Sequence, residues 1–359
     1  MSVVQHGKWK FDYNPGKFIY KINKDTIENN HFKSDDSINT YLGDDLSDYR
    51  KAAIIHRLVR SNILRKIHDG VSFLEIIKEA DDSVSKFIKD GDGGFAFPLG
   101  ISVNEIMAHD TAMLNDERKL KKNDIVKIDL GIHINGCIID SAFTTIVDGD
   151  PDVNSYYDPL IQATKDATYT GICLSGVDAE LYDISEAIQE VIESYELEDG
   201  TPIRAVRGLG GHDILPYRVH GKKLILCVPH KSQENIRMNE GEFYAVETYA
   251  STGNGNCKMK SIEMCNHFMI NENVKMSKQM KKNPVVECEE TKNNSLPFTQ
   301  RQIANIKQIQ KHMNEGVRNR SIVAYPPLID KKGSMTSQFE HTIHIKKESV
   351  EILSLGEDY

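Results

Sequence analysis

The chain of 359 residues is 39% hydrophobic and 27% charged, and it carries a formal net charge of −9 at pH 7. Its length allows one large domain or two with a sizeable buried core, and its acidic balance disfavours a general nucleic-acid binder. No apolar run approaches the length of a membrane span, and the first ten residues lack the apolar core of a signal peptide, so we expect a cytoplasmic protein with no membrane partner.

Helical periodicity begins after a mixed N-terminal stretch. Residues 1–47 combine charge, asparagine and aromatic residues without sustained periodicity, so we interpret them as an N-terminal extension that is draped on the body or partly disordered. A helix is predicted over 49–67 with Asp48 as its cap, and a second amphipathic helix is predicted over 73–88. A β-rich stretch follows over about 95–147.

The same order of elements recurs further along the chain. Helices are predicted over 156–173 and, after a cap at Asp178, over 179–195; strands follow over about 203–269. The repeated order of elements is not accompanied by a convincing repeat of the residues themselves. Two copies of helix, helix and sheet predict a pseudo-symmetric α+β architecture with its site between the halves.

The composition changes between residues 271 and 324. Ten basic residues stand against five acidic ones there, a net charge of +5 in an acidic protein. Ile303, Ile306, Ile309 and Met313 predict a helix with one apolar stripe. We interpret 271–324 as a helical insertion whose charge marks a solvated face, and contact with nucleic acid is the less favoured alternative.

An Asn135-Gly136 turn separates two β-rich runs. This is the strongest short-range signal for a hairpin, because a type I′ turn needs φ > 0 at both central residues. Counting outward from the turn places Asp129 and Asp140 diagonally on one face, roughly 7–8 Å apart at Cα. Two carboxylates at that spacing can bind one ion or two adjacent ions; the alternative is that both are solvated on an open sheet face.

Two further predicted strands carry carboxylates. In the strand over 243–249, Glu247 shares a face with apolar and aromatic residues, so it must be paired, protonated or metal-bound to avoid a large desolvation cost. The strand over 338–346 carries Glu340 on its more polar face. Glu247 is therefore the more informative of the two carboxylates.

Other chemistries find little support in the sequence. The glycine cluster before His212 lets the backbone approach a neighbour, but it lacks the glycine spacing and the βαβ context of a dinucleotide-binding loop. No G-x-S-x-G elbow supports a serine nucleophile, and none of the six cysteines has C-x-x-C spacing. Single histidines such as His109, His212 and His220 are more often structural than catalytic.

Taken together, these motifs resemble those of the methionine aminopeptidases of the pita-bread fold, most closely type II. The resemblance covers roughly 48–359, and the insertion before Tyr325 separates type II from type I. It implies an α+β pita-bread (creatinase/aminopeptidase) fold, in which a pseudo-twofold antiparallel sheet is covered by helices. The catalytic domain is then 48–270 with 325–359, and 271–324 is a helical insertion subdomain. The matching motifs stand in the family's order: Ala96-Phe-Pro-Leu-Gly, Ala108-His109, Lys127-Ile-Asp-Leu-Gly, Ile139-Asp140, Gly211-His212, Tyr244-Ala-Val-Glu-Thr, Tyr325-Pro-Pro-Leu and Gln338-Phe-Glu-His-Thr.

By this resemblance, five residues are ligands of two divalent cations: Asp129, Asp140, His212, Glu247 and Glu340. One ion is held by Asp129, Asp140 and Glu340, and the other by His212, Glu247 and the same two bridging residues, Asp140 and Glu340. Four carboxylates carry −4 and two dications +4, so a buried site approaches neutrality only when both ions are present. Ligands that are mostly oxygen, with a single imidazole, suit Mn²⁺, Co²⁺ or Fe²⁺ better than a tetrahedral structural zinc.

The resemblance also implies roles in a reaction. A hydroxide bridging the two ions is the nucleophile, Glu247 is the proton shuttle, and His109 and His220 stabilise the tetrahedral intermediate. The implied reaction is removal of the initiator methionine from nascent chains with a small second residue. The methionine pocket is lined by Phe97, Val219, His220, His267 and Tyr325.

Two features depart from the type II pattern. Gly210 stands where an asparagine is expected, and we expect it to loosen the loop around His212 without removing a ligand. The lysine-rich N-terminal extension of some type II members is missing, which puts ribosome tethering by that route in doubt.

Two other functions remain as alternatives. A prolidase or aminopeptidase P shares the five ligands, but it normally carries an N-terminal domain larger than residues 1–47 allow. A non-catalytic pita-bread protein that binds RNA or ribosomes has lost metal ligands, whereas all five residue types are present here. We expect a monomer that acts on N-terminal methionyl peptides, and we leave ribosome association open.

Overall fold

The structure is a computed structural model that describes residues 4–6, 9–11, 46–88, 91, 93–291 and 296–356. Most of the predicted extension, residues 1–47, therefore lies outside the described residues. Within it, β1 (Val4–His6) and β2 (Trp9–Phe11) pair as an antiparallel hairpin. Among the described helices, none combines the length and the apolar character that crossing a membrane requires.

The first half of the fold follows the predicted order of two helices and a sheet. Ser72 begins α3 with a capping box, because its side chain accepts from the Glu75 amide while the Glu75 carboxylate accepts from the Ser72 amide. The elements are α2 (Ser47–Lys66), α3 (Phe73–Phe87), β3 (Gly93–Phe95), β4 (Gly100–Val103), β5 (Ile106–Ala108), β6 (Ile125–Ile134) and β7 (Cys137–Ile146).

The second half repeats this order and then adds the insertion. Short 3-10 turns at 231–233, 262–264, 280–282 and 300–303 connect several of its elements. The elements are α4 (Pro151–Leu174), α5 (Leu181–Glu193), β8 (Arg204–Ala205), β9 (Gly210–Ile214), β10 (Leu224–Leu226), β11 (Phe243–Ser251), β12 (Lys258–Met259), β13 (Phe268–Ile270), α6 (Pro284–Thr291), α7 (Ile309–Arg318), β14 (Ile322–Ala324), β15 (Leu328–Ile329), β16 (Thr336–Ile345) and β17 (Val350–Ile352).

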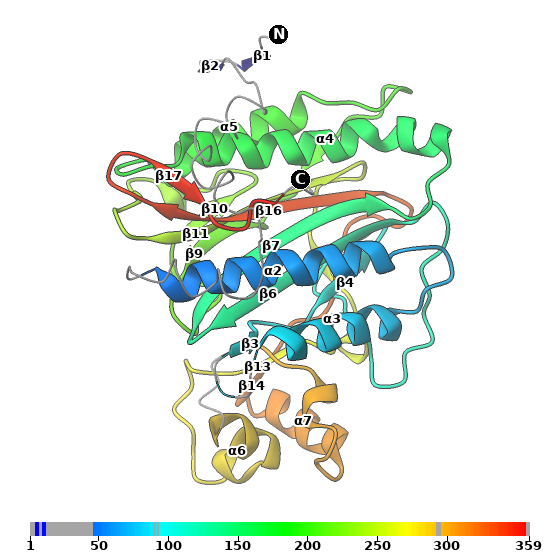
Figure 1. The fold of residues 1–359 in the computed structure, drawn as a ribbon, viewed down its shortest axis with the longest axis vertical. Helices are drawn as coiled ribbons and strands as arrows, with labels where there is room; N and C mark the ends of the chain where they lie inside the picture. Colours follow the sequence, from blue (N-terminus) through cyan, green and yellow to red (C-terminus); the bar gives the residue numbers. More distant parts are fainter. Residues whose placement is uncertain are drawn as a thin grey trace.

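Two antiparallel sheets form the centre of the molecule. In one, β6 pairs with β7 along one edge and with β3 and β4 along the other. In the other, the order is β10-β9-β11-β16-β17, with β8 also paired to β11. The α2–α3 pair lies on the first sheet and the α4–α5 pair on the second, while α6 and α7 lie at the end of the molecule opposite α4 and α5 (Figure 1). The predicted α+β class with antiparallel sheets covered by helices is confirmed.

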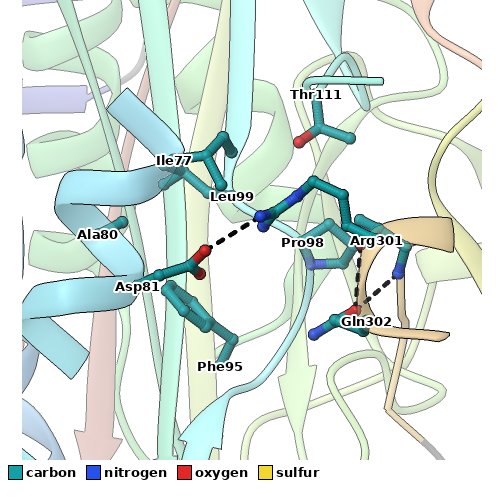
Figure 2. A pocket seen from close by; sticks show the side chains of 10 residues that line it. Ile77, Ala80, Asp81, Phe95, Pro98, Leu99, Thr111, Arg301 and Gln302 are labelled. Atoms are coloured by element: carbon teal, nitrogen blue, oxygen red, sulfur yellow. Dashed lines mark hydrogen bonds and ion pairs between the residues drawn. The ribbon is translucent and has the colours of Figure 1, made fainter. Parts of the chain in front are cut away.

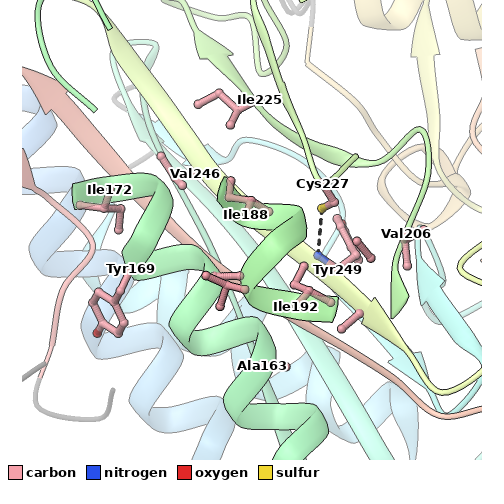
Figure 3. Packing of buried hydrophobic residues seen from close by; sticks show 14 of the residues in the cluster. Ala163, Tyr169, Ile172, Ile188, Ile192, Val206, Ile225, Cys227, Val246 and Tyr249 are labelled. Carbon is pink, nitrogen blue, oxygen red and sulfur yellow. Dashed lines mark hydrogen bonds between the residues drawn. The ribbon is translucent and has the colours of Figure 1, made fainter. Parts of the chain in front are cut away.

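Each helix pair buries an apolar stripe against its own sheet. On α5, Ile184, Ile188 and Ile192 recur at helical spacing and are buried in one cluster with residues of α4 and β11. Figure 3 shows Ile188 and Ile192 in this cluster. Val246 of β11 packs into the same cluster. Full burial of one such side chain contributes about 1.5–3 kcal/mol, so these stripes fix the helices on the sheets.

Hydroxyl groups join the two sheets where β7 meets β16. Thr144 Oγ1 donates to the Gln338 carbonyl at 2.7 Å and accepts from the Gln338 amide at 2.8 Å. Further along, Ser141 Oγ donates to the Glu340 carbonyl at 2.7 Å, and the Asp140 amide donates to Thr342 Oγ1 at 2.7 Å. At this junction, side-chain hydroxyls pair the backbone groups of β7 and β16 that would otherwise pair with a neighbouring strand. They thereby fix the position of one sheet relative to the other.

Two predicted helix caps are wrong. Asp48 lies inside the first turn of α2, where its carboxylate accepts from Asn135 Nδ2 at 3.0 Å instead of capping the helix. Asp178 lies before α5 with φ +68°, and the residue at the cap position is Glu180, which makes no side-chain cap bond. In both cases a tertiary partner competes with the local cap: Arg237 pairs with Asp178 and Glu180.

The predicted helix through 303–313 is interrupted. A 3-10 turn ends at Ile303, and α7 begins only at Ile309 because Gln308 has the left-handed φ of +55°. The predicted apolar stripe is nevertheless buried, since Ile303 and Met313 pack with β13, β14 and α6 in one cluster. The domain boundaries at 47, 270 and 324 stay predictions.

Candidate metal centre

The hairpin of β6 and β7 has the predicted register. Asn135 and Gly136 have φ of +48° and +83°, as a type I′ turn requires. Gly131 lies opposite Asp140, and Asp129 lies two residues before Gly131 on the same face. The two aspartates are therefore diagonal neighbours on one side of the hairpin, as the sequence predicts.

Three strands of the second sheet bring the remaining groups together. Glu247 of β11 lies directly opposite Glu340 of β16, and His212 of β9 lies opposite Ala245, two residues before Glu247. His212 Nε2 lies 3.9 Å from Glu247 Oε1 and 3.9 Å from Asp140 Oδ2 of the other sheet. Strand register alone thus places both glutamates and the imidazole on one face.

The two sheets present these groups to one another. Ligand atoms of Asp140, His212 and Glu340 all lie within 4.8 Å of one another, and the three residues are buried. Asp129 and Glu247 act electrostatically on both Asp140 and Glu340. All five predicted ligand positions therefore converge on a single place between the halves, and their role as ligands is a proposal.

Burial makes this cluster unfavourable without cations. It raises the pKa of Asp129 to about 6, and burial together with the neighbouring Asp129 raises the pKa of Glu247 to about 8. Burial, followed by the neighbouring carboxylates, raises the pKa of Asp140 and of Glu340 well above the ordinary range. Four carboxyl groups so close together either keep protons or bind cations.

The donor set fits divalent metal ions. Burial lowers the pKa of His212 well below 6.5, so the imidazole is neutral and has a lone pair to donate. Asp129 Oδ1 and Asp140 Oδ1 are buried and have no hydrogen-bond partner in the described part of the chain. Unpaired buried carboxylate oxygens are costly unless a proton or a cation satisfies them, so this donor set is suited to a divalent cation.

Two polar residues that the sequence interpretation missed support the carboxylates. Gln338 Nε2 lies 3.2 Å from Asp129 Oδ2, 3.2 Å from Glu247 Oε2 and 2.8 Å from the Tyr249 hydroxyl. The period of two along a strand would have found both, because Gln338 is two residues before Glu340 and Tyr249 is two residues after Glu247. Partners of this kind orient the groups that bind a metal.

A group of aromatic rings lies beside the carboxylates. The ring of His220 stacks on that of His212 with centroids 3.8 Å apart. The ring of His109 lies 5.3 Å from that of His267 and 5.7 Å from that of Tyr325. His220 also acts electrostatically on His109 and His267. His109 and the predicted pocket residues His220, His267 and Tyr325 therefore lie close together, and His220 adjoins the carboxylate cluster through His212.

Apolar side chains complete this region. Phe97 and Val219 share a buried cluster, and Phe97 covers Gly131: a Cβ at Gly131 would lie 2.2 Å from Phe97 Cε1. Gly131 thus leaves room for a ring beside the two aspartates. Leu296, a residue of the insertion that the sequence interpretation missed, packs in the same cluster.

The pocket histidines are neutral near pH 7. Burial lowers the pKa of His109 to about 4 and that of His220 to about 4. His109 also has φ +65°, a conformation that non-glycine residues adopt only where surrounding structure holds them. Both residues can therefore donate or accept hydrogen bonds without adding charge to the site.

The expectation for Gly210 is not supported. Gly210 begins β9 and lies opposite Leu226 of β10, so it belongs to a paired strand and not to a loosened loop. Its φ is +152°, and a Cβ there would lie 2.3 Å from the Ile225 carbonyl oxygen. Glycine at this position lets β10 approach β9 closely.

A separate crevice lies where the insertion meets α3 (Figure 2). Arg301 Nη1 of the insertion pairs with Asp81 Oδ2 at 3.0 Å across it. The segment 95–99 forms another of its walls and also carries Phe97. The crevice contains none of the five candidate ligands, so it is distinct from the metal centre.

Known proteins are similar to this chain in sequence and in fold. The model of metallopeptidase family M24 matches residues 47–275. Methionine aminopeptidase 2 of Candida albicans is 38% identical over 323 residues, which cover 87% of this chain and 70% of that protein. Methionine aminopeptidase 2 of Paracoccidioides lutzii is 41% identical over 334 residues, covering 88% and 73%.

Solved structures match at lower identity. A thermophilic Arx1 has a TM-score of 0.72 at 19% identity, covering 88% of this chain and 91% of that chain. Methionine aminopeptidase of Thermotoga maritima has a TM-score of 0.59 at 19% identity, covering 90% and 98%. Prolidase of Pyrococcus furiosus has a TM-score of 0.51 at 13% identity, covering 87% and 64%. Identities this low show a shared fold alone.

The pita-bread fold, with acidic groups and an imidazole buried between its halves, defines a metallopeptidase. The chain belongs to metallopeptidase family M24 and, within it, to the type II methionine aminopeptidases. It is therefore a hydrolase of the metallo-exopeptidase class that uses divalent metal.

Removal of metal is expected to destabilise the protein more as the pH rises. Carboxyl groups with raised folded-state pKa values stabilise the metal-free fold fully below their unfolded values near 4. This stabilisation is lost as the pH rises through the pKa values of the folded state, which are about 6 for Asp129 and about 8 for Glu247. The unfolding free energy of stripped protein should fall, relative to loaded protein, by on the order of a few kcal/mol between pH 5 and 9.

Thermal unfolding of chelated and Mn²⁺-reloaded protein across this pH range measures the effect. The difference in Tm between metal-loaded and chelated protein should increase with pH, and it should disappear when the chelated protein is reloaded. A gap that is constant or narrows would contradict a cluster of repelling carboxylates.

Gln338→Met keeps the volume of the side chain but removes its hydrogen bonds to Asp129 and Glu247. Metal affinity is expected to fall about 10–100-fold, because loss of a group that orients ligands typically has that effect. Titration of stripped protein with Mn²⁺ measures it. Gln300→Met, at a buried glutamine in the insertion, is the matched control and should leave affinity unchanged.

Proposed function

We propose that the five converging residues bind two divalent cations and that the enzyme removes initiator methionine from nascent chains with a small second residue. Asp129, Asp140 and Glu340 would hold one ion; His212 and Glu247 would hold the other, with Asp140 and Glu340 bridging. The observation that carries this proposal is the burial of three carboxyl groups, together with one oxygen of the half-buried Asp129, against one neutral imidazole. Mostly oxygen ligands favour Mn²⁺, Co²⁺ or Fe²⁺.

Bound divalent ions would supply two kinds of chemistry: they lower the pKa of a coordinated water and polarise the scissile carbonyl. Glu247 is proposed as the proton shuttle, which accepts a proton from the attacking water and passes it to the leaving amine. Its position supports this role, because it lies beside His212 and Gln338. Gln338 keeps one carboxylate oxygen in a fixed direction.

His109 and His220 are proposed to bind the substrate's peptide group and stabilise the tetrahedral intermediate. Their lowered pKa values support hydrogen bonding by neutral imidazoles. A slot of apolar and aromatic groups that ends at the carboxylates would admit one unbranched thioether side chain. The proposed lining of that slot is Phe97, Val219, His220, His267 and Tyr325.

The alternatives are less well supported. Similarity to prolidase is limited to the fold, at 13% identity, whereas methionine aminopeptidase 2 relatives reach 38–41% over most of the chain. A non-catalytic pita-bread protein would not be expected to keep five ligand-type residues in one buried cluster. The insertion subdomain 271–324, the cytoplasmic location, the monomeric state and ribosome association stay predictions.

The function is tested with short peptides. Purified protein loaded with Mn²⁺ should release methionine from Met-Ala-Ser and should not cleave Ala-Pro. Activity should disappear on chelation and return on reloading, and Asp140→Ala should abolish it. Cleavage of Ala-Pro, or undiminished activity in folded Asp140→Ala protein, would refute the proposal.

His109→Ala separates catalysis from metal binding. Removing one donor to a developing oxyanion typically lowers turnover about 10²–10³-fold, and we expect a loss of that order with unchanged metal content. Steady-state kinetics and elemental analysis of the same preparation measure both. His68→Ala, at an exposed histidine beyond the end of α2, is the control and should change neither. Equal loss of metal and activity in His109→Ala would contradict the assigned role.

A further inference from the structure

Exposed apolar side chains gather in one short segment. Among the described residues, three of the large apolar side chains that are exposed lie between Met259 and Met264, here named the rim segment. Met259 is 74% exposed, Ile262 is 52% exposed and Met264 is 39% exposed. Single exposed apolar residues are ordinary, but a group of them at one place indicates a contact surface.

Both ends of the rim segment are tied to the proposed methionine pocket. At one end, Met259 lies opposite Leu328 of β15, and Leu328 lies opposite Ala108, the residue before His109. At the other end, Met264 lies three residues before His267, whose carbonyl accepts from the Tyr325 amide at 2.9 Å. The rim segment is therefore continuous with the backbone that positions the pocket.

The chemistry of the rim segment suits a partner of variable sequence. Methionine is flexible and polarizable, so it adapts to different apolar surfaces, and such residues are common where one protein binds many sequences. Lys258 and Lys260 flank Met259 and add charge that keeps the surface soluble. The Lys260 amide donates to the Pro327 carbonyl at 2.8 Å, which holds this part of the backbone in place.

We propose that the rim segment binds the substrate polypeptide beyond its second residue, with Met259 and Ile262 as the main contacts. This inference rests on the proposed function, because the chain of a methionyl substrate must leave the pocket past the residues around it. The partner is a polypeptide with apolar residues after its N-terminal Met-Ala-Ser. Long apolar substrates are then favoured over tripeptides without any change in the chemical step.

The test compares Met-Ala-Ser with the same peptide extended by leucine and valine residues or by glycine and serine residues. For the wild-type enzyme, the apolar extension is expected to lower KM about tenfold, equivalent to roughly 1.4 kcal/mol of binding. In the double variant Met259→Ser/Ile262→Ser that advantage should vanish, while the kinetics of Met-Ala-Ser stay unchanged. Val177→Ser is the control, since Val177 is an exposed apolar residue (47%) between α4 and α5, outside the rim segment.

Several outcomes would overturn the inference. One is that the wild-type enzyme has equal KM values for all three peptides. Another is that the double variant keeps the lower KM for the apolar extension. A third is that the protein self-associates in sedimentation experiments through Met259 and Ile262. Binding of a fluorescent apolar peptide is measured alongside turnover. If no methionine is released but binding still depends on the rim segment, the proposed function fails and the docking surface stands.

Discussion

Repulsion among four clustered carboxyl groups, three of them in buried residues, is the constraint on which this structure depends. Asp129, Asp140, Glu247 and Glu340 come from four strands, and each one alone would be better solvated in water. Only these strand registers bring them close to one another, since a slip of one residue would turn a carboxylate to the opposite face. These registers are set by the type I′ turn, by the β11–β16 pairing and by the hydroxyl hydrogen bonds between β7 and β16.

The residues that directly follow three of these carboxylates form hydrogen bonds on the side of the strands away from the cluster. The carbonyl of Leu130, next to Asp129, accepts from the buried His56 of α2 at 2.8 Å. Ser141, next to Asp140, lies 3.5 Å from Arg60 Nη1, which also donates to the Ser354 carbonyl at 2.9 Å. His341, next to Glu340, hydrogen-bonds with Ser354 Oγ at 2.8 Å. The helix α2 thus fixes the strands that carry the cluster.

Features that depend on neighbouring residues in the sequence, such as turns and amphipathic helices, could be predicted from the sequence. The Asn135-Gly136 turn fixes the hairpin register, and amphipathic periodicity locates the helices of both halves, so these could be predicted. The false cap at Asp48 depends on Asn135, a tertiary neighbour that no local pattern contains. The helix break at Gln308 was missed because the left-handed backbone there falls on a residue type that does not signal it. The turn alone predicted that Asp129 and Asp140 share a face. The full set of five candidate ligands came from a family resemblance, because nothing in spacing alone brings Glu340 beside Asp140. Gln338 was missed although strand periodicity contains the signal.

The seam between β7 and β16 also affects how the chain acquires its structure. Ser141 and Glu340 touch across it although 199 residues separate them. During synthesis β7 is therefore complete long before its neighbour exists, and closing so large a loop carries an entropic cost and slows folding. Until β16 has been synthesised, the edge of β7 lacks its partner, and an unpaired strand edge of this kind can pair with other extended chains.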